Sequence, residues 1–194
     1  MDEAEAFWAS SRPQISIFPQ VDQEFAELSS LNEMDLSGDI IPPEARFGGK
    51  ATNLARLGRV LSGTFDDWVE VGFGIPVYYY LQFMRANRIA SALDPTREVT
   101  YEEHLRELFD SKEFATNSEM RFRALQDFRD FARQNGGVED ELVDRLASRI
   151  VEIFGSAETM VRFRSSSNVE DALEFNGAGL YESTGVCVAD TLDN

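Results

Sequence analysis

The chain has 194 residues, 43% of them hydrophobic, which is enough for one domain or two small lobes with a proper core. Its formal net charge of -17, from 35 acidic and 18 basic residues, argues against a general nucleic-acid binder and against a protein that adheres to anionic membranes, since both need a basic surface. Any anion that the chain binds must be held by local basic groups, so clustered arginines and lysines are informative.

Neither a membrane span nor a secretory signal is predicted. The longest uncharged run, residues 71–84, falls short of the roughly 20 apolar residues that a spanning helix needs. The acidic start differs from the basic start of a signal peptide, and the single cysteine, Cys187, cannot form an internal disulfide. We therefore expect a cytoplasmic protein that binds neither nucleic acid nor membranes. With one histidine and one cysteine, no metal-ligating set is predicted.

Residues 1–45 are expected to form a leading segment. It contains an alternating run over residues 14–18 that suits an edge strand, and it ends at the extended Pro42-Pro43 pair. Residues 46–194 are expected to form one domain.

A glycine turn that opens a helix is predicted at Phe47-Gly-Gly-Lys50, because apolar residues recur at helical spacing after it. Such a start presents unpaired backbone N–H groups and the positive end of the helix dipole, which together favour an anion. Lys50 in the first turn is unfavourable with the dipole unless an anion binds there. The segment is not a Walker A loop, since Glu44 stands in place of its first glycine. A simple turn before a helix remains the alternative.

The middle of the chain is predicted to be one strand followed by helices. Residues 68–75 alternate as a strand, and Pro76 suits the first turn of a helix running to Met84, whose three tyrosines we expect to pack in the core. Thr100 and Glu103 form a capping-box pattern. Helices are expected over roughly 118–134 and 139–154.

Apolar and basic residues alternate in Val161-Arg-Phe-Arg164, so a strand here would place both guanidinium groups on one face. Paired arginines followed by Ser165-Ser-Ser-Asn168 suit the binding of phosphate or carboxylate oxygens. A solvated strand face followed by a capping loop is the alternative. Gly177 and Gly179 then allow close approach of the backbone to a ligand, or form a hairpin turn, before a strand-like run over 180–188.

Four segments resemble motifs of one family, the phosphoenolpyruvate synthases and pyruvate phosphate dikinases. Arg164-Ser-Ser-Ser-Asn-Val-Glu-Asp171 resembles the Arg-Ser-Ser-x-x-x-Glu-Asp motif of the family's nucleotide-binding region. Phe47-Gly-Gly-Lys-Ala-Thr-Asn-Leu54 is similar to its opening nucleotide motif, and Gly72-Phe-Gly-Ile-Pro76 to the segment after its first helix. Asn176-Gly-Ala-Gly-Leu-Tyr-Glu-Ser183 falls where the family has its glycine loop.

The resemblance implies an α+β fold, the N-terminal lobe of an ATP-grasp-like domain with a mixed or antiparallel sheet and an inserted helical segment. It implies that Gly49, Lys50 and Ser165 bind ATP, and that Arg164 is catalytic and holds the transferring phosphate. The loop with Gly177 and Gly179 would close over the phosphates.

The family's remaining parts are expected outside this chain. They are a second nucleotide lobe that carries the magnesium ligands, a phosphohistidine domain and a barrel domain. The resemblance thus implies either a fragment of a kinase-type phosphotransferase or a naturally short relative of one, and a chain that lacks dikinase activity by itself. The alternative is a non-catalytic binding or regulatory module that keeps only the fold. The phosphoryl acceptor is left open between pyruvate, a glucan and an antibiotic.

Overall fold

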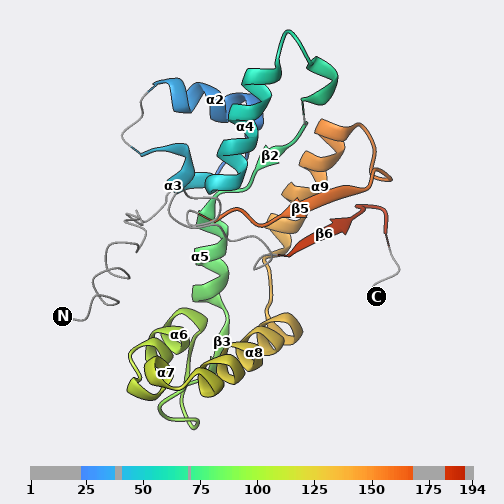
Figure 1. The fold of residues 1–194 in the computed structure, drawn as a ribbon. Coiled ribbons are helices and arrows are strands. Elements are labelled where there is room, and N and C mark those ends of the chain that lie inside the picture. Colours follow the sequence, from blue (N-terminus) through green and yellow to red (C-terminus); the bar gives the residue numbers. More distant parts are fainter. Residues whose placement is uncertain (1–22, 38–40, 70, 168–181, 191–194) are drawn as a thin grey trace, which may run out of the picture. The chain divides into compact units, whose positions relative to one another are not determined.

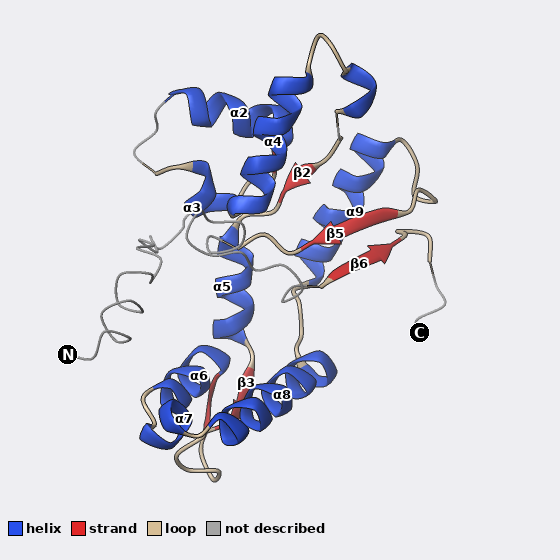
Figure 2. Ribbon diagram, in the orientation of Figure 1, coloured by secondary structure: helices blue, strands red, loops and turns tan. Residues whose placement is uncertain are grey.

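The computed structural model describes residues 23–37, 41–69, 71–167 and 182–190 (Figure 1). The expected strand over 14–18 and the predicted Gly177–Gly179 loop lie outside these residues. The described chain mixes helices with short strands, which confirms the α+β class (Figure 2). Contacts divide it into two compact units: unit 1 contains the described residues up to Tyr78 and from Arg145 on, and unit 2 contains Tyr79–Asp144.

Each described strand belongs to a two-stranded antiparallel pair. In unit 1, β1 (Ala26–Glu27) pairs with β2 (Phe73–Gly74), and β5 (Val161–Arg164) pairs with β6 (Ser183–Val186). In unit 2, β3 (Arg88–Ala90) pairs with β4 (Glu98–Thr100).

The core of unit 1 forms between α2 (Leu28–Ser37), α3 (Pro43–Phe47) and α4 (Gly49–Leu61), which lie together in Figure 1. Leu31 and Phe47 are almost completely buried, and Ala55 of α4 packs with them. The described part of the predicted leading segment thus supplies core residues, and Phe47, directly before the Gly-Gly turn, is fixed in this core.

Helix α9 (Asp140–Phe154) contributes two arginines to unit 1, and both contact residues 23–27, the segment that contains β1. Arg145 donates to the Gln23 carbonyl (2.9 Å), and its guanidinium lies 4.9 Å from the centre of the Phe25 ring. Arg149 forms an ion pair with Glu27 (2.8 Å). These contacts join segments more than 100 positions apart, so unit 1 depends on long-range packing.

Unit 2 contains the β3–β4 hairpin, most of α5 (Val77–Ala86), and the helices α6 (Tyr101–Phe109), α7 (Lys112–Thr116) and α8 (Ser118–Asn135). Tyr101 is completely buried and meets the rings of Phe83 and Phe128 edge-on, at centroid distances of 5.7 and 5.4 Å. Met84, Ile89 and Val99 complete the cluster. Edge-to-face contacts of this kind are favourable beyond the area that they bury.

Several predicted elements are confirmed and two expectations are wrong. The helices at 49–61, 118–135 and 140–154 and the strand at 161–164 are present, and Thr100 and Glu103 form the predicted capping box. The predicted strand over 68–75 is reduced to β2, because Asp66–Trp68 forms a 3-10 turn and the partner strand β1 has only two residues. Tyr80 is 58% exposed, so it does not pack in the core.

Among the described residues, no helix is both long and apolar enough to cross a membrane.

Candidate anion-binding site

Lys50 lies in the first turn of α4, and Gly48 sets where that helix begins. Gly48 has φ 84° and ψ 164°, a backbone conformation that is essentially restricted to glycine. Its N–H donates to the carbonyl of Glu44, in the first turn of α3 (2.9 Å), and the chain then turns sharply from α3 into α4. Thr52 then donates its hydroxyl to the Gly48 carbonyl (3.0 Å) inside the core. Lys50 therefore sits on a turn with a fixed backbone.

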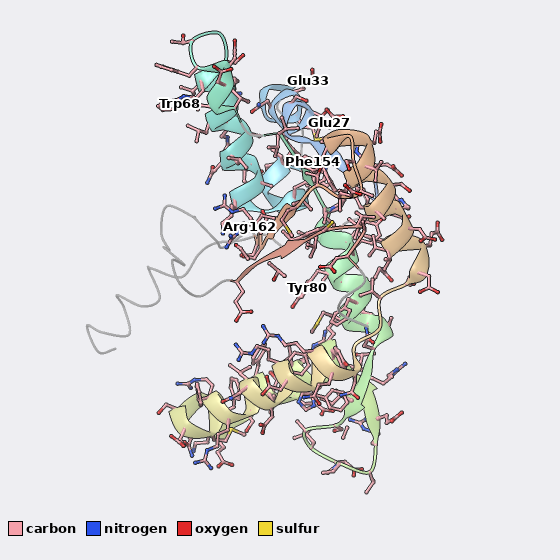
Figure 3. The ribbon with its side chains drawn as sticks, turned by 90° about the vertical axis from the view of Figure 1, so that its right-hand side faces the viewer. Glu27, Glu33, Trp68, Tyr80, Phe154 and Arg162 are labelled. Atoms are coloured by element: carbon pink, nitrogen blue, oxygen red, sulfur yellow. The ribbon has the colours of Figure 1, made fainter. Side chains whose placement is uncertain are left out.

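Arg164 ends strand β5, whose side chains alternate as the sequence predicts. Val161 and Phe163 are half-buried, whereas Arg162, labelled in Figure 3, and Arg164 are exposed. Arg164 lies opposite Ser183 in the antiparallel register with β6. The strand therefore places both guanidinium groups on its outer face, because neighbouring side chains point to opposite sides.

The segment after Arg164 is hydrogen-bonded to the first turn of α4. The Gly49 N–H donates to the Ser167 carbonyl (2.8 Å), and the Ala51 N–H donates to the Ser166 hydroxyl (3.0 Å). The same hydroxyl donates to the Phe47 carbonyl (2.7 Å). We call residues 47–51 together with 164–167 the α4–β5 junction. It brings two of the sequence motifs, more than 100 positions apart, into direct contact within unit 1.

The junction is closed around Gly48. A Cβ atom built on Gly48 would overlap the carbonyl and the hydroxyl oxygen of Ser166, far inside van der Waals contact. Glycine is therefore required here twice, once by the backbone angles and once by the space that Ser166 occupies.

The hydrogen bonds limit how far Arg164 can lie from Lys50. Both neighbours of Lys50 are bonded to residues two and three positions after Arg164. Two extended residues span at most roughly 7 Å, so the backbones of the two motifs stay close. Convergence of the two side chains on one anion stays a prediction that this arrangement permits.

The expectation of open N–H groups at the helix start is wrong for two of them. The N–H groups of Gly49 and Ala51 are taken by Ser167 and Ser166. These groups belong to the donors that a helix leaves without an internal partner, and here a distant loop satisfies them. An anion at the junction would be bound mainly by side chains.

The guanidinium groups on β5 differ from other arginines of unit 1. Arg56 forms an ion pair with Glu44 (2.6 Å), and Arg149 binds both Glu27 and Glu152. Within the described ranges, Arg162 and Arg164 form no ion pair or side-chain hydrogen bond with another residue. Both guanidinium groups are exposed on one face of the strand, a geometry that suits the binding of an external anion.

A pocket of about 230 Å³ lies beside the junction in unit 1. It is lined by residues of β1, α2, α3 and α9, and it shares Phe47 with the junction. One of its cations, Arg149, is bound to Glu27 (2.8 Å) and Glu152 (2.6 Å). Because both its prongs are occupied, this arginine is a structural link and offers little to a ligand.

The sequence motifs predicted Gly49 and Ser165 as binding residues, whereas the close packing involves Gly48 and Ser166. Gly49 takes part through its N–H group. Ser166 is the middle of three consecutive serines, and no local pattern distinguishes it from its neighbours. The glycine pair at 48–49 was a usable signal, since a glycine turn is where another backbone can approach closely.

The part of the chain that the structure describes contains no group of three or more His, Cys, Asp or Glu side chains that could hold a metal ion.

Comparison of the chain with protein-family models, curated proteins and solved structures finds no match.

Proposed function

We propose that the chain is the ATP-binding N-terminal lobe of a phosphotransferase similar to the phosphoenolpyruvate synthases and pyruvate phosphate dikinases, with an ATP-grasp-like fold. The supporting observation is the α4–β5 junction. The Lys50 turn and the Arg164 strand each resemble a nucleotide motif of that family, and the Gly49 N–H to Ser167 bond joins them. A shared phosphate site requires these two motifs to lie together, and the junction brings them into contact although they are more than 100 positions apart.

The proposed chemistry is positioning and charge stabilisation. ATP supplies the transferable phosphoryl group when bound. Lys50 neutralises phosphate oxygens as a point charge, and Arg164 binds them with a two-pronged guanidinium that holds the transferring group in one orientation. Fixed donors around a phosphoryl group are the main catalytic contribution that proteins make to this reaction. The phosphate then passes to a histidine on another domain of the parent protein.

An ATP titration of the 194-residue chain tests this function. Backbone amide signals of residues 47–51 and 164–167 should shift by NMR as ATP is added, with weak affinity because half of the nucleotide site is expected elsewhere. Arg164→Ala should weaken binding at least about tenfold, since a charged hydrogen bond contributes about 1.5–3 kcal/mol. Arg164→Lys should weaken it by less, since the ammonium keeps the charge and loses the fork.

Arg123→Ala is the matched control. Arg123 lies on α8, where it is exposed and paired with Glu119 (2.7 Å), so the change removes the same charge away from the junction. Equal effects of Arg164→Ala and Arg123→Ala would show that ATP responds to overall charge only, and would contradict the proposal. The fold of Arg164→Ala should persist, because this side chain is exposed.

A non-catalytic module is the second candidate, and one observation favours it. The Gly49 and Ala51 N–H groups already have internal partners, so the junction also makes sense as a structural clasp. A folded chain whose junction signals do not respond to ATP would support this candidate.

A further inference from the structure

One hydroxyl group connects the loop after β5 to α4 through two hydrogen bonds. Ser166 accepts from the Ala51 N–H and donates to the Phe47 carbonyl. Both partners are backbone groups on the turn that carries Lys50, so their positions do not depend on side-chain rotamers. The hydroxyl acts as an N-cap supplied from 115 positions away.

Arg164 is fixed from the other side by the sheet. Its register opposite Ser183 places it at the end of the β5–β6 pair, and only Ser165 separates it from Ser166. A segment anchored at both ends over so few residues has little conformational freedom. If the hydroxyl were removed, the loop would keep the Gly49 N–H to Ser167 carbonyl bond to the turn.

We infer that Ser166 is a positioning residue, which holds the loop on α4 and thereby sets the separation of Lys50 and Arg164 for phosphate binding. The inference rests on the proposed function. A two-pronged guanidinium needs its orientation fixed before the ligand arrives, since a freely moving loop loses entropy on binding. Ser166 itself does not touch the phosphate, because its hydroxyl is engaged with backbone groups.

The test compares Ser166→Ala with Ser166→Thr, which keeps the hydroxyl. Without ligand, Ser166→Ala should speed hydrogen exchange of the Ala51 amide about fivefold to tenfold, in line with the loss of one hydrogen bond. At a temperature where both variants are folded, the dissociation constant of Ser166→Ala for ATP, measured by NMR titration, should rise about fivefold. Ser166→Thr should restore both quantities to within about twofold of the original chain.

Ser111→Ala is the matched control for a lost serine cap. Ser111 caps α7 by accepting from the Phe114 N–H (3.4 Å), and it lies in unit 2. This change should leave both Ala51 exchange and the ATP dissociation constant unaltered. If Ser166→Ala does not fold, Ser166→Cys gives the same comparison, because the thiol has nearly the same size and forms weaker hydrogen bonds.

The outcomes separate this inference from the proposed function. Faster Ala51 exchange with an unchanged ATP affinity would reduce Ser166 to a structural cap and overturn its positioning role. Tighter ATP binding by Ser166→Ala would overturn it as well, since the hydroxyl would then compete with phosphate for the amide. If the original chain does not respond to ATP, the proposed function fails. If Ser166→Ala leaves the exchange rate of the Ala51 amide unchanged, the Ser166 hydroxyl does not protect that amide, and the inference about Ser166 fails.

Discussion

The first turns of α4 and α6 are capped in different ways. At α6 the cap is local: Thr100 accepts from the Glu103 N–H (3.1 Å), and the Glu103 carboxylate accepts from the Thr100 N–H (2.8 Å). At α4 the cap is the hydroxyl of Ser166, supplied by a loop 115 positions later. A local cap stabilises one helix, whereas a distant cap also decides which two segments meet. The α4 cap therefore joins the two motifs of the proposed phosphate site.

The largest expected effect is at Gly48, where the distant cap has no room for a side chain. Gly48→Ala should lower the free energy of unfolding by about 3 kcal/mol, from backbone strain together with overlap with Ser166. Urea denaturation measures this loss.

Gly63→Ala is the control for a positive φ without steric overlap. Gly63 has nearly the same φ, 82°, but a Cβ atom there meets nothing within 4 Å. Its cost should be about 1 kcal/mol. Equal losses of unfolding free energy in Gly48→Ala and Gly63→Ala would mean that Ser166 does not pack closely against Gly48. The difference between the distant cap of α4 and the local cap of α6 would then lose its support.

The next effect is at Thr100. Thr100→Ala should cost about 1 kcal/mol, the usual contribution of a single N-cap. It should speed exchange of the Glu103 amide and leave the Ala51 amide unchanged, because the α6 cap involves no residue of the junction. Faster exchange of the Ala51 amide in Thr100→Ala would show that the cap of α6 also stabilises the α4–β5 junction, which contradicts this expectation.

The smallest effect concerns acid. Hydrogen bonds from the backbone and side chain of Thr100 lower the pKa of Glu103 below its ordinary value of 4.5. A carboxyl with a lowered pKa stabilises the folded state above its unfolded pKa, and this contribution disappears as the pH falls through the folded pKa. Glutamine at this position can form the same capping box without titrating.

In Glu103→Gln the free energy of unfolding should therefore decrease less below about pH 4.5 than in the original chain. Urea denaturation at neutral and acidic pH measures this difference. The α4 cap consists of a hydroxyl and a carbonyl, which do not titrate in this range. Ala51 exchange, corrected for its intrinsic pH dependence, should stay constant over the same interval. If the original chain and Glu103→Gln lose the same unfolding free energy between neutral and acidic pH, the role assigned to Glu103 is contradicted.

Local chemistry explains which parts of the fold could be predicted. The outward direction of Arg162 and Arg164 follows from strand periodicity, and the start of α4 follows from a glycine turn before a helical pattern. The predicted strand over 68–75 is wrong for a local reason, the 3-10 turn at Asp66–Trp68, and for a non-local one. Its length is limited by β1, a partner of two residues that lies more than 40 positions earlier.

The candidate site divides in the same way. Local patterns were enough to predict that Lys50 follows a glycine turn and that Arg164 ends a strand with its side chain outward, since both properties depend on neighbours within a few residues. The role of Ser166 as the cap depends instead on long-range packing. Three adjacent serines carry the same hydroxyl, and which of them reaches the Ala51 N–H depends on how closely the loop approaches Gly48, a distance that no local pattern contains.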